Sequence, residues 1–212
     1  MEMLSTKHFK IVFNVNIGNI NEKKANSLSN VFDAAFEVKM LQEQPFGNVF
    51  VLSNPTNREA LIIDPGKITY QLESEENISP NFESINKFFQ NIFDTLLLEE
   101  NATGLIHLIG TVPSKNENSM SDSLTNFLPS QNFETHINNL KGIGLRFLIE
   151  HHTGVWEYKV EPQINDTRFF FIEMINNINK NIHFSETINI AQEYFNDFND
   201  RKLNVLNQLN IL

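Results

Sequence analysis

The sequence predicts an α+β protein built mainly on an antiparallel sheet, with two longer helices covering it. Several segments alternate apolar and polar residues, which is typical of half-buried strands. Two other segments carry apolar residues at helical spacing. Hydrophobic residues make up 41% of the 212 residues and charged residues 20%, the proportions of an ordinary folded domain.

The first two strands are indicated by strict alternation. Phe9 to Ile17 places five apolar side chains on one side and polar ones on the other. A polar stretch then leads to a short helical or turn segment at Ser27 to Asp33. Ala34 to Leu41 alternates again and predicts the second strand.

Three more strands are predicted before the first long helix. Val49 to Leu52 and Ala60 to Ile63 flank an Asn/Pro loop, and Asp64 to Lys67 has the Pro-Gly composition of a tight turn. That turn leads into a strand with Ile68, Tyr70 and Leu72 on one face.

The first long helix is expected after Ser79 and Pro80, which are a plausible N-cap and first helical residue. Its apolar stripe comprises Phe82, Ile85, Phe89, Ile92 and Leu96. Such a stripe more often packs on a core than binds a ligand.

The second half begins with Gly104 to Val112, which is apolar on both sides and therefore predicts a central strand covered on both faces. Ser121 or Ser123 is expected to cap a short helix that ends near Pro129, and Ser130 to Lys141 shows no clear pattern. The remaining predicted elements are strands at Ile143 to Glu150, Val155 to Val160 and Thr167 to Met174, and a long C-terminal helix capped by Ser185.

Residues 1–102 and 103–212 are predicted to be two α+β halves packed as one globular unit. Each half follows the order strand, helix, strands, helix. Duplication of one unit is one explanation of this order, and convergence on common patterning is the other.

Charge and composition set bounds on the partners. Twenty-six acidic and 16 basic residues give a net charge of −10, so no direct nucleic-acid binding is expected. There is no cysteine, which excludes disulfides and thiolate metal sites. No apolar run approaches the length of a membrane span and the N-terminus lacks signal-peptide features, so a cytoplasmic location without membrane association is expected.

Three short segments resemble an uncharacterised, sporadically distributed bacterial family. They are Ala34 to Lys39, Leu61 to Tyr70 and Gly142 to Phe147. The family has an Ala-Val-Phe-Glu-like early strand and a Leu-Gly-Leu-Arg-Tyr-like late strand. The resemblance implies a bacterial origin, but it implies no activity and supplies no catalytic residues.

The sequence has no phosphate-binding loop, dinucleotide fingerprint, zincin helix or nucleophile elbow. We therefore predict no catalytic residue, no cofactor and no metal ligand. The adjacent His151 and His152 would point to opposite faces of a strand, so they could share an ion only at a turn or bulge.

The best candidates for ligand binding are His107, Arg146, Glu150 and Tyr158. His107 lies in a strand that otherwise looks buried. Arg146 could clamp an anionic ligand, or it could pair with Glu150 or Glu37 across the sheet.

The favoured function is a non-catalytic interaction or regulatory protein with another protein as its partner, such as an accessory component of a bacterial defence or toxin-neutralising system. One alternative is a small-ligand binder or enzyme with an apolar pocket under the sheet. The other is an acidic nucleic-acid mimic. Leu203, Leu206 and Leu209 of the C-terminal helix could form a homodimer, although covering the protein's own sheet is the favoured role.

Overall fold

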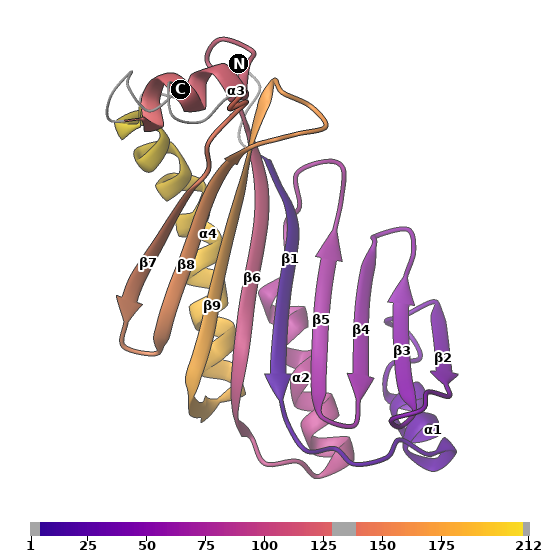
Figure 1. The fold of residues 1–212 in the computed structure, drawn as a ribbon. Helices are drawn as coiled ribbons and strands as arrows, with labels where there is room; N and C mark the ends of the chain where they lie inside the picture. Colours follow the sequence, from indigo (N-terminus) through magenta and orange to yellow (C-terminus); the bar gives the residue numbers. More distant parts are fainter. Residues whose placement is uncertain (1–4, 129–138, 210–212) are drawn as a thin grey trace.

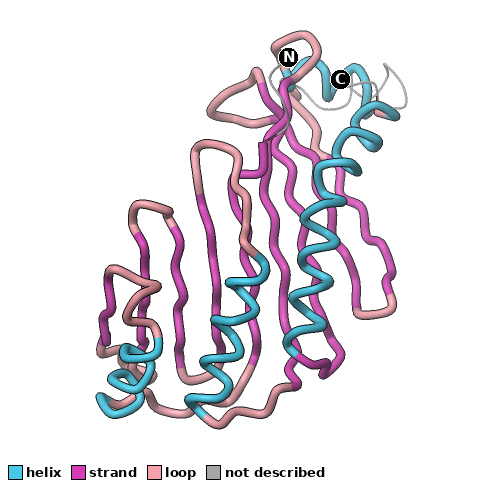
Figure 2. The backbone as a smooth tube through the Cα atoms, turned by 180° about the vertical axis from the view of Figure 1, so that it is seen from behind, coloured by secondary structure: helices cyan, strands magenta, loops and turns pink. Residues whose placement is uncertain are grey.

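One antiparallel sheet of nine strands runs through the part of the chain that the computed structural model describes, residues 5–128 and 139–209 (Figure 1). Of residues 199–206 only the backbone is described. Three helices lie against one face of the sheet, as the view from behind shows (Figure 2). The predicted α+β class with a mainly antiparallel sheet is confirmed.

The elements follow one another in an order that is similar in the two halves of the chain. The first half contains β1 (Ser5–Asn14), α1 (Glu22–Val31), β2 (Val38–Gln42), β3 (Val49–Asn54), β4 (Glu59–Asp64), β5 (Lys67–Glu73) and α2 (Phe82–Leu96). The second half contains β6 (Asn101–Pro113), α3 (Ser119–Phe127), β7 (Leu145–His151), β8 (Gly154–Pro162), β9 (Phe169–His183) and α4 (Phe184–Gln208). The first half has five strands and the second four, and duplication remains a hypothesis.

The strand order across the sheet is β2-β3-β4-β5-β1-β6-β9-β8-β7. The first strands of the two halves, β1 and β6, pair with each other at the middle of the molecule. Residues 1–102 and 103–212 therefore share one continuous sheet. The strands β2 and β7 form its two edges.

The core lies between the sheet and the helices, and phenylalanine fills much of it. Phe13 of β1 is fully buried, with its ring 4.6 Å from that of Phe89 and 6.1 Å from that of Phe93, both in α2. Phe93 in turn stacks on Phe184 of α4 at 4.8 Å. Aromatic contacts of this kind link the sheet to both long helices, which explains the abundance of phenylalanine.

Asparagine side chains cap the first three helices, whereas serine caps were predicted for the second and third. The Asn21 side chain accepts a hydrogen bond from the Lys24 amide at 3.0 Å, so α1 starts five residues before the predicted Ser27. Asn81 caps α2 by accepting from Ser84, and Asn118 caps α3 by accepting from Ser121. Asparagine is as good a cap as serine, and the starts of α2 and α3 contain both residues.

The expectation that β6 is covered on both faces is wrong. Burial alternates strictly along β6. Ile106 and Leu108 are fully buried, and His107 between them is half-buried. β2 begins at Val38, since residues before it form a turn that carries Phe36 into the core. β9 runs nine residues beyond the predicted end at Met174. Most of the unpatterned segment 130–141 lies outside the described residues.

None of the helices described in residues 5–128 and 139–209 has the length and apolar character needed to cross a membrane.

Candidate functional site

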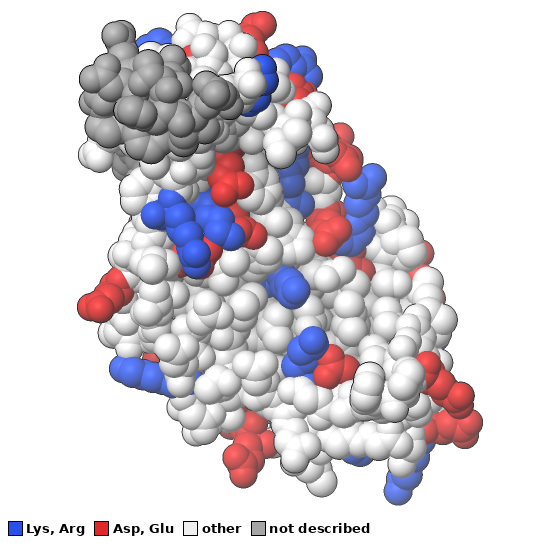
Figure 3. All heavy atoms as spheres, in the orientation of Figure 1, with Lys and Arg blue, Asp and Glu red and all other residues white. Residues whose placement is uncertain are grey.

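The face of the sheet opposite the helices carries no covering element in the described part of the chain. Phe9, Ile11 and Phe13 of β1 are buried under the helices, so the alternate residues His8, Lys10 and Val12 point the other way. We call this second side the open face. Figure 3 looks onto it and shows mostly uncharged atoms, with charged side chains gathered over its upper half.

An apolar row crosses the open face from the edge strand β2 to β8, the strand next to the other edge. Consecutive cross-strand pairs connect its members, with Thr69 and Asn177 as the polar interruptions. The apolar row consists of Met40, Val51, Ile62, Val12, Leu105 and Val155. Except for Val12, their side chains are half-buried or exposed. Water-facing strand positions of antiparallel sheets are usually polar, so the apolar row is a candidate contact surface.

A chain of ion pairs lies beside the apolar row. Lys159 Nζ lies 2.6 Å from Glu173 Oε2 and 3.1 Å from Glu157 Oε1. Arg146 forms an ion pair with Glu157 at the β7 end. At the other end, His107 Nε2 lies 2.8 Å from Glu173 Oε1. These pairs fix the side chains across β6, β9, β8 and β7.

The chain continues through two histidines. The ring centroid of His8 lies 5.1 Å from that of His107, edge to face, and His8 Nδ1 lies 3.0 Å from Glu73 Oε1. We call the whole set the ionic band. It comprises Glu73, His8, His107, Glu173, Lys159, Glu157 and Arg146 and spans six adjacent strands.

The environment shifts the pKa of several members of the ionic band, among them His8 and Glu173. Burial, followed by the nearby charge of His107, lowers the pKa of His8 below its ordinary value of 6.5. Burial alone would raise the pKa of Glu173, but hydrogen bonds from Lys159 and His107 outweigh it and hold that pKa below its usual range. At neutral pH these shifts favour a neutral His8, whose contact with Glu73 is then a hydrogen bond, and an ionised Glu173.

The structure does not bring all four predicted ligand-binding residues together. His107 and Arg146 belong to the ionic band, and Glu150 lies on the same face, at the edge strand β7. Tyr158 points to the covered face and is buried there, where burial raises the pKa of its hydroxyl. Four residues on opposite faces cannot line one pocket.

The predicted partner of Arg146 is wrong. Arg146 pairs with Glu157 on the adjacent strand β8 and not with Glu150 or Glu37. Glu157 could have been found from the sequence, because the short turn between β7 and β8 fixes their register. The contact of Glu173 with His107 could not have been found from the sequence, because Glu173 belongs to β9 and its approach to His107 depends on the strand order.

A hollow of about 710 Å³ opens beside His8 at the upper end of the open face. The ends of β1, β5 and β6 line it together with the β3–β4 hairpin. Its polar lining includes Gln71, Glu73, Arg58 and Glu75. This hollow therefore extends the ionic band with further donors and acceptors.

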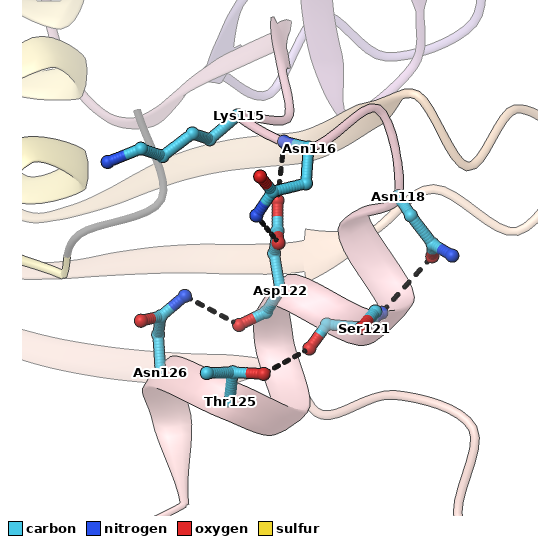
Figure 4. Close-up of a pocket in the computed structure, with 7 residues that line it drawn as sticks. All are labelled: Lys115, Asn116, Asn118, Ser121, Asp122, Thr125 and Asn126. Carbon is cyan, nitrogen blue, oxygen red and sulfur yellow. Dashed lines mark hydrogen bonds between the residues drawn. The ribbon is translucent and has the colours of Figure 1, made fainter.

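A second hollow, of about 530 Å³, lies at the start of α3 (Figure 4). Its centre is Asp122, which is almost fully buried and accepts hydrogen bonds from Ser114 and from the backbone and side chain of Asn116. Burial opposes the charged form, but these hydrogen bonds prevail and lower the pKa of Asp122. These hydrogen bonds hold the loop between β6 and α3 in place. The burial of Asp122 is therefore explained by a structural role in this loop.

The adjacent histidines lie at the turn between β7 and β8. The rings of His151 and His152 are 4.0 Å apart, and His151 Nδ1 lies 2.9 Å from Thr153 Oγ1. Among the described residues, no group of three or more His, Asp or Glu side chains is suited to hold a metal ion.

Comparison with known proteins adds no family. No family model and no curated protein matches the chain. A solved structure of Methanococcus jannaschii TBP aligns with 94% of this chain and 99% of its own, at 12% identity and a TM-score of 0.41. A likeness this distant supports no conclusion about function.

The lowered pKa of His8 predicts a pH dependence of stability. Above pH 6.5 the histidine is neutral in both the folded and the unfolded chain. As the pH falls below 6.5, the unfolded chain takes up the proton first, so the free energy of unfolding decreases until the folded pKa is passed. We expect His8→Gln, which can still donate to Glu73, to remove this part of the slope.

The measurement is the urea midpoint of both proteins at a series of pH values on either side of 6.5. His152→Gln is the control, because His152 is exposed on the β7–β8 turn. An unchanged slope in His8→Gln would contradict the assignment.

Proposed function

We propose that the protein is a non-catalytic interaction protein that binds another protein on the open face of its sheet. The observation that carries the proposal is the apolar row, which crosses a face without a covering element in the described part of the chain. When a partner covers apolar side chains in such a position, their removal from water lowers the free energy of the complex. The ionic band beside the row would fix the orientation of the partner.

Charge indicates the chemistry of that partner. Among the paired strand positions, the open face carries four basic residues, Lys10, Lys67, Arg146 and Lys159, and six acidic ones, Asp64, Glu73, Glu150, Glu157, Glu161 and Glu173. Its excess of two acidic residues is small beside the net charge of −10 of the whole chain. A partner with an apolar contact surface and a basic border suits this distribution.

The two alternatives receive less support. A nucleic-acid mimic needs carboxylates that are free to imitate phosphates, whereas those of Glu73, Glu157 and Glu173 are paired with histidine, arginine or lysine. A small-ligand site under the sheet needs an apolar cavity, whereas the phenylalanine side chains there pack on one another. An accessory role in bacterial defence or toxin neutralisation is the setting we propose, from the acidic composition, the lack of catalytic motifs and the resemblance to a sporadically distributed bacterial family.

The test compares two variants in affinity capture from the native host. Val51→Thr/Ile62→Thr makes the apolar row polar and keeps β-branched side chains, which preserves strand propensity. Val31→Thr makes the same kind of change at an exposed residue of α1, away from the open face. We expect the wild type and Val31→Thr to retain one basic protein in stoichiometric amount, and the double variant to lose it.

Capture that survives the double variant would contradict the proposal. A small molecule released from the wild type, with no protein partner, would favour the polar hollow beside His8 instead.

A further inference from the structure

The edge strand β7 exposes apolar side chains on both of its faces. Phe147, Leu148 and Ile149 follow one another with exposed fractions of 36%, 66% and 47%. β7 is the last strand of the sheet and pairs only with β8, so its outer backbone groups have no strand partner among the described residues. An edge of this kind is a template for pairing with another strand.

The sequence of β7 is complementary to itself. Around Leu148, the residues run Arg146, Phe147, Leu148, Ile149, Glu150. Arg146, Leu148 and Glu150 lie on the open face, and Phe147 and Ile149 lie on the other. An antiparallel copy centred on Leu148 therefore places Arg146 opposite Glu150, and Phe147 opposite Ile149, twice each by symmetry.

We propose that β7 pairs antiparallel with β7 of a second copy of this chain, with the two-fold axis at Leu148. Arg146 of each copy then faces Glu150 of the other, and every exposed apolar side chain of β7 faces an apolar one. This register is possible whichever amides of β7 point outward. The two-fold axis of an antiparallel strand pair can pass through a hydrogen-bonded or a non-hydrogen-bonded residue pair.

The intramolecular contacts of the two charged residues fit this arrangement. Arg146 is mostly exposed although it pairs with Glu157, so its guanidinium can reach a second carboxylate on the outer side. Within its own chain, Glu150 stands opposite Val155, which offers its carboxylate no cation. The second copy would supply that cation.

The other edge of the sheet lacks this complementarity. β2 has five residues and contains Lys39, whose ammonium group forms an ion pair with Asp33. A copy centred on Met40 would place Val38 opposite Gln42 and Lys39 opposite Leu41, with no charge pair. Short strands with lysine are a common way of protecting a sheet edge from pairing.

The dimer would also join the two open faces. The apolar row reaches Val155 on β8, and β7 follows as the next strand. Pairing through β7 would therefore make one continuous sheet with the open faces side by side. This inference rests on the edge strand alone and does not require the proposed partner protein.

Sedimentation equilibrium of the full chain tests the proposal. We expect a reversible dimer of the wild type at micromolar concentrations. Glu150→Lys sets the introduced lysine against Arg146 at two symmetric positions, and Leu148→Lys sets two ammonium groups against each other on the axis. Each should raise the dissociation constant by about tenfold or more. Met40→Lys makes the same kind of change at an exposed apolar residue of the opposite edge; it is the control and should leave the dimer intact.

A mixing experiment tests the register itself. Arg146→Glu and Glu150→Lys each place like charges opposite each other in their own homodimers. In a heterodimer of the two, the introduced glutamate faces the introduced lysine, and the unchanged Glu150 of one copy faces the unchanged Arg146 of the other. Both pairs are then favourable. We expect the mixture to form a 1:1 dimer at concentrations at which each variant alone is monomeric.

Three results would overturn the proposal. They are a wild type that stays monomeric over the whole concentration range, a dimer that neither Glu150→Lys nor Leu148→Lys weakens, and a mixture that stays monomeric while the wild type dimerises. Circular dichroism of each variant confirms that it has folded. Arg146→Glu, Leu148→Lys and Glu150→Lys lie outside the apolar row, so failure here would leave the proposed function standing.

Discussion

Phe13→Ala is expected to lower the free energy of unfolding by about 3 to 5 kcal/mol. Phe13 is fully buried at the middle of the sheet, and its ring contacts Phe89 and Phe93 of α2. Its removal leaves a cavity between rigid aromatic rings that cannot collapse to fill it. A domain of this size is ordinarily stable by about 5 to 15 kcal/mol, so the variant would lose a large share of its stability.

Urea unfolding followed by circular dichroism measures the effect, and Phe46→Ala is the matched control. Phe46 is 98% exposed, so the same change there should alter the free energy of unfolding by no more than about 0.5 kcal/mol. A similar loss in both variants would contradict the placement of the core.

Gly154→Ala is expected to destabilise the fold by about 3 kcal/mol. Gly154 begins β8 opposite Ile178 of β9, and a Cβ there would lie 1.9 Å from the carbonyl oxygen of Asn177. The obstacle is backbone of a paired strand, so relief requires the two strands to separate. The substitution should also weaken the turn that holds β7 in place.

Thermal unfolding of Gly154→Ala beside Gly66→Ala tests this prediction. A Cβ at Gly66 would meet only a side-chain oxygen of Asp64 at 3.9 Å, an ordinary contact distance. We expect Gly66→Ala to melt close to the wild type and Gly154→Ala to melt well below it. Equal melting temperatures would show that β8 and β9 are not held as closely as described.

Periodicity predicted which residues share a face, but not which face would be covered. The alternation of Phe9, Ile11 and Phe13 identified β1, because its other side is polar apart from Val12. β6 is apolar on both sides, and it was therefore expected to be buried on both. Leu105, which contributed to that error, belongs to the apolar row: the residues that misled the fold prediction are those that mark the candidate binding surface.

The candidate site was predictable only in part for a similar reason. His107 and Arg146 stood out as polar groups in apolar strands, and both belong to the ionic band. Tyr158 was assigned to the same pocket because a strand segment alone does not reveal which face lies under a helix. His8 and Glu73 joined the band through the β5-β1-β6 strand order, which is set by long-range pairing and leaves no local signal.

Site-specific photo-cross-linking in the native host tests most directly whether the open face binds a partner protein. A photoreactive residue replaces Ile62 in the apolar row in one variant, and Leu97, which is exposed at the end of α2, in the other. We predict that position 62 forms a cross-link to one basic protein and that position 97 does not. Cross-linking of that protein at position 97 alone, or equally at both positions, would contradict the assignment of the open face as the binding surface.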